Sequence, residues 1–438
     1  MRVSESGPSA GPPQAGPHPL GGPTGALDGR GAPRTAAMPF ILVAVLIDMI
    51  SIGLMVPVLP HIVGRFTHSN DEQTLAFLAV TLTFGIANFV SSPILGALSD
   101  RFGRRPVLLL GFAGLALSFF VTAAATALWM LVAVRMFSGA MQSNISIANA
   151  YVADISAPHE RARRFGLLGA MFGVGFILGP VIGGVLGDID VRLPFVVAGC
   201  MALINWCYGY FVLPESLPVE RRRRFDWRRA NPVAALKGLA ALKGVGALVW
   251  VIALASLAQF MLHMSWVLYT KFKFDWGPGQ VGWSLFAVGV VSAFSQGVLL
   301  KPLLGRFTPR QLAIVGLLVG SVTYLGFGLA TQGWMMYVVI SFGLLGGAAQ
   351  AAMQSIVSNA ADPTRQGQTM GAVSSLNSLM AVVAPVIALE LLRWVSHRPP
   401  GDWLIGLPFF VCSTLQFTAA MVAWRFFHSH KELRAHAA

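Results

Sequence analysis

The chain has 438 residues, of which 55% are apolar and only 11% are charged. Soluble domains carry about 25% charged residues, so this composition and the mean hydropathy of +0.67 exclude an ordinary soluble enzyme. The apolar residues form long runs, whereas a transmembrane barrel is built from alternating segments of about ten residues. Together with the 47 Gly residues, this pattern predicts an all-α membrane protein that crosses the bilayer many times.

The net charge of +13 would indicate a nucleic-acid partner in a soluble protein. Here the Lys and Arg residues form short clusters between apolar runs, which indicates membrane topology, and we expect no nucleic-acid partner. The three Cys residues lie inside apolar stretches and fit neither a disulfide framework nor a metal site. We therefore expect no metal and no cofactor.

The first 37 residues contain eight Gly and seven Pro and almost no large apolar side chain. This composition lacks the apolar core of a signal peptide and predicts a disordered tail. Downstream, runs of the roughly 20 apolar residues that a membrane-spanning helix needs predict twelve transmembrane helices. They lie near 39–60, 74–95, 107–126, 128–150, 165–187, 194–213, 246–270, 278–300, 311–331, 334–357, 369–392 and 405–427.

A polar, Arg-rich stretch separates the first six predicted helices from the last six. The predicted units are a tail at 1–37, an N-terminal six-helix bundle at 38–213, a central loop at 214–245, a C-terminal six-helix bundle at 246–428 and a tail at 429–438. Loops that follow odd-numbered helices hold six Lys and Arg residues, and the other loops and both tails hold 24. The positive-inside rule therefore predicts that both tails and the central loop are cytoplasmic.

Two loops, one in each half, resemble each other. The first reads Leu98-Ser-Asp-Arg-Phe-Gly-Arg-Arg105 and the second reads Leu303-Leu-Gly-Arg-Phe-Thr-Pro-Arg310. The leucine, the Arg-Phe pair and the last arginine match at a constant offset, since 303 − 98 and 310 − 105 both equal 205. Two six-helix halves related by a parallel repeat are the layout of major facilitator transporters, so the sequence predicts that fold.

The segment Gly96-Ala-Leu-Ser-Asp-Arg-Phe-Gly-Arg-Arg-Pro106 resembles the signature loop of the major facilitator superfamily. An acidic side chain near a helix N-terminus is favoured by roughly 0.3–1 kcal/mol. We therefore expect Asp100 to lie against helix N-termini, in a latch whose contacts break and form as the two halves move. A purely topological basic loop is the alternative. The predicted gating residues are Gly96, Asp100, Arg101, Gly103, Arg104 and Arg105.

The segment Gly175-Phe-Ile-Leu-Gly-Pro-Val-Ile-Gly-Gly184 resembles the antiporter motif of drug–proton exchangers. Glycines at every fourth position form one smooth face that lets another helix approach closely, and the proline loosens the helix. Generic close packing is the alternative. The predicted motif residues are Gly175, Gly179, Pro180, Gly183 and Gly184.

The stretch Ala150-Tyr-Val-Ala-Asp-Ile-Ser-Ala-Pro-His-Glu-Arg-Ala-Arg-Arg-Phe-Gly166 and the shorter segments Leu213-Pro-Glu-Ser216 and Arg365-Gln-Gly-Gln368 resemble the tetracycline-exporter branch of that superfamily. The resemblance implies a proton-coupled exporter in a bacterial inner membrane, and a monomer is expected. Three membrane positions depart from the branch, because ionisable residues are expected where this chain has Ser118, Ser292 and Gly320. This departure argues against a tetracycline–magnesium substrate.

Four ionisable residues inside or near the predicted helices are candidates for proton coupling: Asp48, Arg135, His263 and Glu390. A carboxylate as deep as Asp48 is costly unless it takes up a proton or finds a partner, and a fixed ion pair with Arg135 is the alternative. Arg135 resembles the conserved arginine of helix 4 in the superfamily, with snorkelling toward a helix end as the alternative. Glu390, near Arg393, also fits an interfacial ion pair. His263, one turn after Gln259, also fits a residue that is hydrogen-bonded in place.

Further polar and aromatic residues of the predicted helices are candidates for substrate binding, because polar groups in a membrane bundle face its interior. We expect this role for Asn149, Gln259, Gln296, Asn377 and Trp266, with packing as the alternative for the tryptophan. No nucleophile motif, phosphate loop or Walker motif is present, so we expect neither an enzyme nor an ATP-driven pump.

The expected function is the export of a hydrophobic drug-like small molecule in exchange for protons, by alternating access, with the lipid bilayer as the other partner. A major facilitator transporter of a metabolite and a non-transporting membrane sensor are the alternatives.

Overall fold

The computed structural model describes residues 37–157, 159–222, 246–343 and 366–435, and all regular secondary structure in these ranges is helical. The N-terminal half consists of α1 (Ala37–Met55), α2 (Leu59–Gly64), α3 (Asn70–Phe102), α4 (Arg104–Ala124), α5 (Leu128–Met141), α6 (Asn144–Ile155), α7 (Arg161–Ile189) and α8 (Leu193–Phe211), followed by the short η2 (Val219–Arg221).

The C-terminal half is also helical in its described residues. It consists of α10 (Gly246–Phe274), α11 (Pro278–Phe294), the π-helical η3 (Ser295–Leu299), α12 (Leu300–Arg306), α13 (Pro309–Leu329), α14 (Gly333–Phe342), α16 (Gln366–Val395), η4 (Trp403–Gly406) and α17 (Leu407–Ala435). Most of the predicted central loop and of the tail at 1–37 lies outside the described residues, as does the second half of the predicted helix at 334–357.

Ten helices in the described ranges are long and apolar enough to cross a membrane. The fourth predicted helix is broken into α5 and α6 at Gln142 and Ser143, and α14 covers the first part of the tenth. Several helices extend beyond their apolar runs, because capping groups add polar turns. Ser69 accepts a hydrogen bond from the Glu72 amide, so α3 begins at Asn70, before the predicted start at 74.

Among the closely packed helix pairs, α1 with α7 in the N-terminal half corresponds to α10 with α16 in the C-terminal half. Both α7 and α16 contain an internal proline, Pro180 and Pro385. These prolines stand 385 − 180 = 205 residues apart, the same offset that relates the two repeated loops. The repeat therefore extends from the loops into the packing of the helices.

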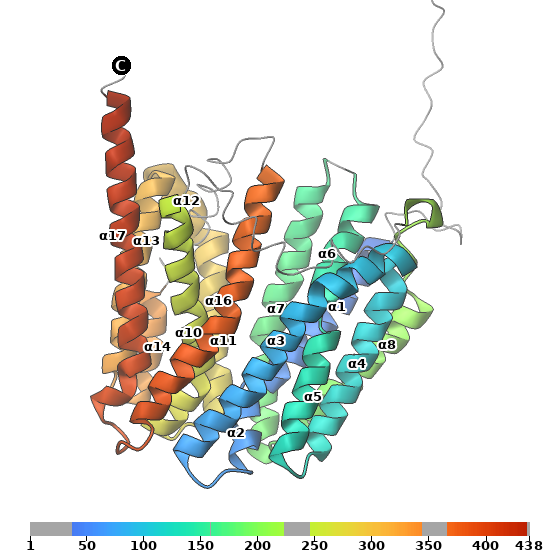
Figure 1. Ribbon diagram of the computed structural model, residues 1–438, viewed down its shortest axis with the longest axis horizontal. Coiled ribbons are helices and arrows are strands. Elements are labelled where there is room, and N and C mark those ends of the chain that lie inside the picture. Colours follow the sequence, from blue (N-terminus) through green and yellow to red (C-terminus); the bar gives the residue numbers. More distant parts are fainter. Residues whose placement is uncertain (1–36, 158, 223–245, 344–365, 436–438) are drawn as a thin grey trace, which may run out of the picture.

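The two halves meet where α7 packs on α11 and α3 packs on α16. Figure 1 shows α3 and α16 converging near α2 and diverging toward the other end of the molecule. We call the end that carries Gly96–Pro106 the signature-loop end, and the end that carries α2 the opposite end.

Polar contacts between the halves lie at the opposite end. Lys271 Nζ donates to Gln73 Oε1 at 2.6 Å, and the Gly279 amide donates to Asp188 Oδ1 at 2.9 Å. Arg393 lies 3.9 Å from Asp71. Because the helices diverge from here toward the signature loop, the two halves are closed against each other at the opposite end (Figure 1).

Candidate functional site

Asp48 lies in the interior of the N-terminal half. It belongs to α1 and is only 3% exposed. Within the part of the chain that the structure describes, its one side-chain hydrogen-bond partner is neutral: Asn144 Nδ2 donates to Asp48 Oδ1 at 3.2 Å. Among the described residues Asp48 makes no ion pair, so an ionised carboxylate here would have neither bulk water nor a cation to stabilise it.

Two buried amides contact this part of α1, one at Asp48 and one at Ala44. Asn144 begins α6, directly after the break in the fourth membrane segment, and its Oδ1 is buried without a hydrogen-bond partner. Asn205 of α8 donates to the Ala44 carbonyl, one turn before Asp48, at 2.9 Å, and its Oδ1 is also buried and unpaired. Buried polar atoms are normally satisfied, so unpaired acceptors beside a carboxyl group are typical of a functional polar site.

Arg135 does not neutralise Asp48. The guanidinium of this α5 residue donates to the Met55 sulfur and lies over the Phe84 ring, 5.4 Å from its centre. Asp48 and Met55 are separated by seven residues of α1, which is about 10 Å along the helix axis. The alternative of a fixed Asp48–Arg135 ion pair is therefore absent from this structure, and the half holds one buried acidic and one buried basic group that do not pair.

Arg104 is the centre of the signature loop. It is buried, and it contacts Asp100 Oδ1 at 2.6 Å, Asp154 Oδ2 at 3.0 Å and Ser99 Oγ at 2.7 Å. Asp154 belongs to α6, so the arginine ties the junction of α3 and α4 to the fourth membrane segment. All of these partners lie in the N-terminal half, and among the described residues Asp100 pairs with Arg104 of its own half.

A different acid lies at the helix N-terminus where Asp100 was expected. The Glu215 carboxylate accepts hydrogen bonds from the backbone amides of Arg104, at 2.8 Å, and Arg105, at 3.3 Å, in the first turn of α4. Gly103 joins α3 to α4 with φ of +107°, and a Cβ there would collide with the Glu215 carboxylate. The turn therefore requires glycine at this position, whereas Gly96 faces open space.

The glycines of the predicted antiporter motif lie on two faces of α7. A Cβ added at Gly179 would lie 2.6 Å from the Gly53 Cα, and Gly175 and Gly183 meet the α1 backbone and Met49 as closely. On the other face, a Cβ at Gly184 would lie 2.6 Å from the Pro278 carbonyl of α11. Gly282 of α11 approaches the Pro180 carbonyl in the same way. The motif therefore packs α7 against its own half and against the opposite half.

Neutral hydrogen bonds connect the polar residues of the C-terminal half. Tyr324 of α13 donates to Gln259 Oε1 at 3.1 Å, and Gln259 Nε2 lies 3.5 Å from His263 Nε2. Ser256 donates to Asn377 of α16 at 2.7 Å. The predicted residues Gln259, His263 and Asn377 thus share a region of polar contacts on and beside α10.

The remaining predicted residues are dispersed. Trp266 is 3% exposed among aromatic rings and donates to Ser284 Oγ at 3.0 Å, so in this structure it is a packing residue. Asn149 is exposed on α6 and donates to the Ile145 carbonyl of its own helix. Gln296 is exposed in the π-helical η3. Glu390 lies 3.1 Å from Arg393 Nε at the opposite end, where it forms an ion pair.

Two of the three positions at which this chain departs from the tetracycline-exporter branch are closely packed. Ser118 is buried in α4 and donates to the Leu115 carbonyl at 2.8 Å. A Cβ at Gly320 would lie 2.9 Å from Gln416 Nε2 of α17, so an acidic side chain there would require Gln416 to move. Local packing in this chain accommodates the neutral residues.

The sequence did not single out Asn205 or the capping role of Glu215. Asn205 is one polar residue in an apolar run, and hydropathy does not tell which way a side chain faces. Glu215 lies in the family-like segment Leu213–Ser216, yet its contact with the Arg104 amide spans 111 residues of chain. Both residues could have been found from one signal: amide and acidic side chains are rare in and near membrane helices, so each one that occurs there is a candidate for a specific contact.

Comparisons with known proteins agree with this architecture. The family model for the Major Facilitator Superfamily matches residues 41–385 and 247–435. The class C tetracycline resistance protein of Escherichia coli is 33% identical over 371 residues, covering 84% of this chain and 93% of that protein. The class D protein of Salmonella ordonez is 32% identical over 366 residues, covering 83% of this chain and 92% of that protein.

A solved structure, that of a human organic anion transporter, has a TM-score of 0.64 to this chain at 22% identity, and covers 90% of this chain and 100% of that one. At this identity the likeness shows the fold, and it confirms the predicted all-α membrane architecture. The family and the transporter structures indicate a multi-pass membrane transporter rather than an enzyme. By its family model and its tetracycline-resistance relatives, the chain belongs to the Major Facilitator Superfamily.

Proposed function

We propose that this chain exports a hydrophobic drug-like small molecule in exchange for protons, with Asp48 as the proton-carrying group. The observation that carries the proposal is the Asp48 carboxyl, buried in the membrane with one neutral partner, Asn144, at 3.2 Å. The tetracycline-resistance relatives support export of a drug-like molecule. The proton gradient supplies the energy, so no cofactor is needed.

The basic loops support a signature-loop end that faces the cytoplasm, with both termini on that side of a bacterial inner membrane. The closed opposite end then faces the periplasm, and this conformation accepts substrate from the cytoplasm. Opening the periplasmic end requires separation of Lys271 from Gln73, of Asp188 from the Gly279 amide and of Arg393 from Asp71. The glycine-lined contact of α7 with α11 provides a smooth surface for this rocking movement.

Coupling requires that the substrate and the proton compete for one protein state. A proton taken up from the periplasm neutralises Asp48 and favours the return of the empty carrier. Substrate that binds from the cytoplasm favours the state in which Asp48 loses that proton.

The substrate region combines the charged N-terminal interior with the neutral polar residues of the C-terminal half. Gln259, His263 and Asn377 offer hydrogen bonds without net charge. A hydrophobic molecule with a few polar groups matches this lining. Ser118 and Gly320, where the tetracycline branch resemblance implies ionisable residues, weigh against a tetracycline–magnesium chelate. We expect a monomer that binds no nucleic acid.

Energised everted vesicles provide the test. Addition of a compound panel that includes tetracycline should release protons from vesicles with the wild-type chain, and Asp48→Asn should abolish the response. Glu390→Gln is the matched control, because that carboxylate is paired with Arg393 at the opposite end. It should respond as the wild type does.

The outcomes separate the alternatives. A response that persists in Asp48→Asn but disappears in Glu390→Gln would contradict the assignment of the proton to Asp48. If no compound of the panel causes proton release by the wild-type protein, and the protein is shown to be in the membrane, drug–proton exchange is contradicted. That result would favour a metabolite transporter or a non-transporting sensor.

A further inference from the structure

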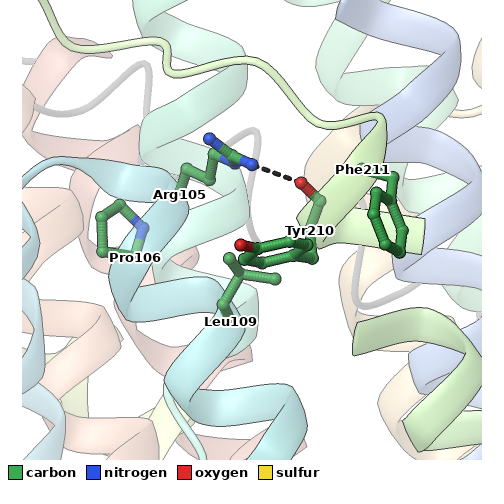
Figure 2. Close-up of a pocket in the computed structure, with 5 residues that line it drawn as sticks. All are labelled: Arg105, Pro106, Leu109, Tyr210 and Phe211. Carbon is green, nitrogen blue, oxygen red and sulfur yellow. Dashed lines mark hydrogen bonds between the residues drawn. The ribbon is translucent and has the colours of Figure 1, made fainter. Parts of the chain in front are cut away.

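A pocket lies on the outside of the N-terminal half, away from the proton-coupling residues. It has a volume of about 340 Å³ and is lined by Arg105, Pro106, Leu109, Tyr210 and Phe211. These residues come from the first turns of α4 and the last turn of α8, and Figure 1 places both helices at the outer edge of this half. Figure 2 shows the Tyr210 ring lying beneath the Arg105 side chain, with its hydroxyl end on the side of Leu109 and Pro106.

Arg105 has unused hydrogen-bonding capacity. Its Nη2 donates to the Tyr210 backbone carbonyl, and its guanidinium lies 5.9 Å from the centre of the Tyr210 ring. Its Nε is buried without a partner, and within the described residues the side chain makes no ion pair. The nearby acids are already engaged, because Asp100 pairs with Arg104 and the Glu215 carboxylate accepts from backbone amides of α4. The pocket therefore presents a cation that lacks its own anion.

The surroundings of the pocket are those of a membrane interface. Tyr210 is 50% exposed and Phe211 is 74% exposed, and Leu110 on the adjoining turn of α4 is 47% exposed. Aromatic side chains with one polar end gather at the level of lipid headgroups. Arginine is the side chain best suited to bind phosphate, because its planar group can donate two parallel hydrogen bonds.

We propose that this pocket binds the phosphate of an anionic phospholipid in the leaflet at the signature-loop end. Arg105 donates to the phosphate, the Tyr210 hydroxyl contacts the headgroup, and Leu109 and Phe211 pack against the upper acyl chain. A soluble phosphate ester would share the Arg105 contact but would gain nothing from the apolar walls. The pocket adjoins the signature loop, so the bound lipid would hold the first turn of α4, where Glu215 also binds.

Binding to the purified, delipidated full-length protein in detergent tests the proposal. Native mass spectrometry would follow titration with phosphatidylglycerol, with phosphatidylethanolamine and with soluble glycerol phosphate. Arg105→Gln should weaken phosphatidylglycerol binding by about five-fold or more, by the usual strength of one interfacial arginine. Tyr210→Leu keeps the backbone carbonyl that holds Arg105 and should weaken binding by a smaller factor, which covers the case in which Arg105→Gln does not fold.

Arg310→Gln is the matched control. Arg310 is the second residue of α13, as Arg105 is of α4, and it lies 5.6 Å from the centre of the Phe427 ring. We expect this variant to bind phosphatidylglycerol as the wild type does, and glycerol phosphate not to compete. Unchanged binding in both pocket variants, or an equal loss in Arg310→Gln, would overturn the proposal. Displacement of the lipid by glycerol phosphate would overturn the lipid assignment in favour of a soluble phosphate.

Discussion

Position 48 of the N-terminal half holds Asp48, whereas the corresponding position of the C-terminal half, 205 residues later, holds Ala253. Arg135 likewise corresponds to Ile340. Both charged residues are buried and neither is paired with the other, whereas Ala253 and Ile340 are ordinary buried apolar residues. At these two positions one architecture is used twice, and the N-terminal copy has ionisable side chains where the C-terminal copy has apolar ones.

The same difference extends to packing. Gly53 and Gly179, which bring α1 and α7 together, correspond to the buried residues Ala258 and Ala384 of α10 and α16. The C-terminal pair therefore has methyl groups where the N-terminal pair has none. This difference fits the proposed function, in which the proton binds at Asp48 in the N-terminal half and neutral polar residues of the C-terminal half contact the substrate.

The largest effect expected from this division is that of Asp48→Asn on substrate accumulation. At a gradient of about 180 mV, one proton contributes roughly 4 kcal/mol, or about a thousand-fold in the accumulation ratio. The amide keeps the shape of the side chain but cannot carry the proton, so that ratio should collapse toward one. Steady-state accumulation of a transported compound in everted vesicles measures it. If Asp48→Asn still accumulates the compound, the assignment of proton coupling to the N-terminal half is contradicted.

The next effect concerns the α1–α7 contact. Gly179→Ala places a methyl group 2.6 Å from the Gly53 Cα, so the backbones must separate, at a cost of about 1–3 kcal/mol. Gly173→Ala is the matched control, because a Cβ there meets nothing within 4 Å. Thermal unfolding of the two purified variants in detergent should differ clearly. Equal stability would mean that the glycine at 179 is replaceable, as Ala384 suggests for the other half.

The signature loop and its repeat should respond unequally to loss of an arginine. Arg104→Gln leaves Asp100 and Asp154 without their shared cation, and these carboxylates are partly solvated, so we expect a loss of about 1–2 kcal/mol. Arg310 is exposed and contacts the Phe427 ring. Arg310→Gln removes only that contact and should change the free energy of unfolding by less than about 0.5 kcal/mol. Chemical unfolding compares the two. A larger effect at Arg310 would reverse the comparison between the loops.

The smallest effect should arise in the C-terminal half. Gln259→Leu removes a hydrogen-bonding group that Tyr324 and His263 contact, and a lost neutral hydrogen bond costs about 1 kcal/mol, or roughly five-fold in affinity. We expect the KM for the transported compound to rise by that factor while the proton-to-substrate ratio stays the same. Parallel flux measurements of substrate and protons test this. A changed ratio would assign coupling to both halves.

Much of the fold could be predicted from the sequence, because membrane helices follow from apolar runs of sufficient length. The repeated loop around Arg105 and Arg310 predicted the major facilitator fold, and the family model confirms that family. Hydropathy could not predict the break at Gln142 and Ser143, since apolar residues continue on both sides of it. It also could not predict the π-helical turn that carries Gln296, because that turn depends on packing.

The candidate site was predicted less completely. The depth of Asp48 in an apolar run indicated a buried carboxyl group, but its partners come from helices far along the chain. Asn144 and Asn205 contact α1 across 96 and 161 residues of sequence. Trp266 is a residue type that often binds substrates, but here it donates a hydrogen bond to Ser284 and lies among aromatic rings. It therefore belongs to the packing of the C-terminal half. The face of a helix that points into the bundle depends on the helices packed around it, so it could not be predicted from the local sequence.

The central claim is that substrate binding and the proton on Asp48 exclude each other. The most direct measurement is proton release from purified protein in weakly buffered detergent, followed with a pH indicator, on addition of a compound identified in the vesicle assay. We predict release of about one proton per bound molecule for the wild type and none for Asp48→Asn, which should still bind the compound. Equal proton release by the two proteins would contradict the account.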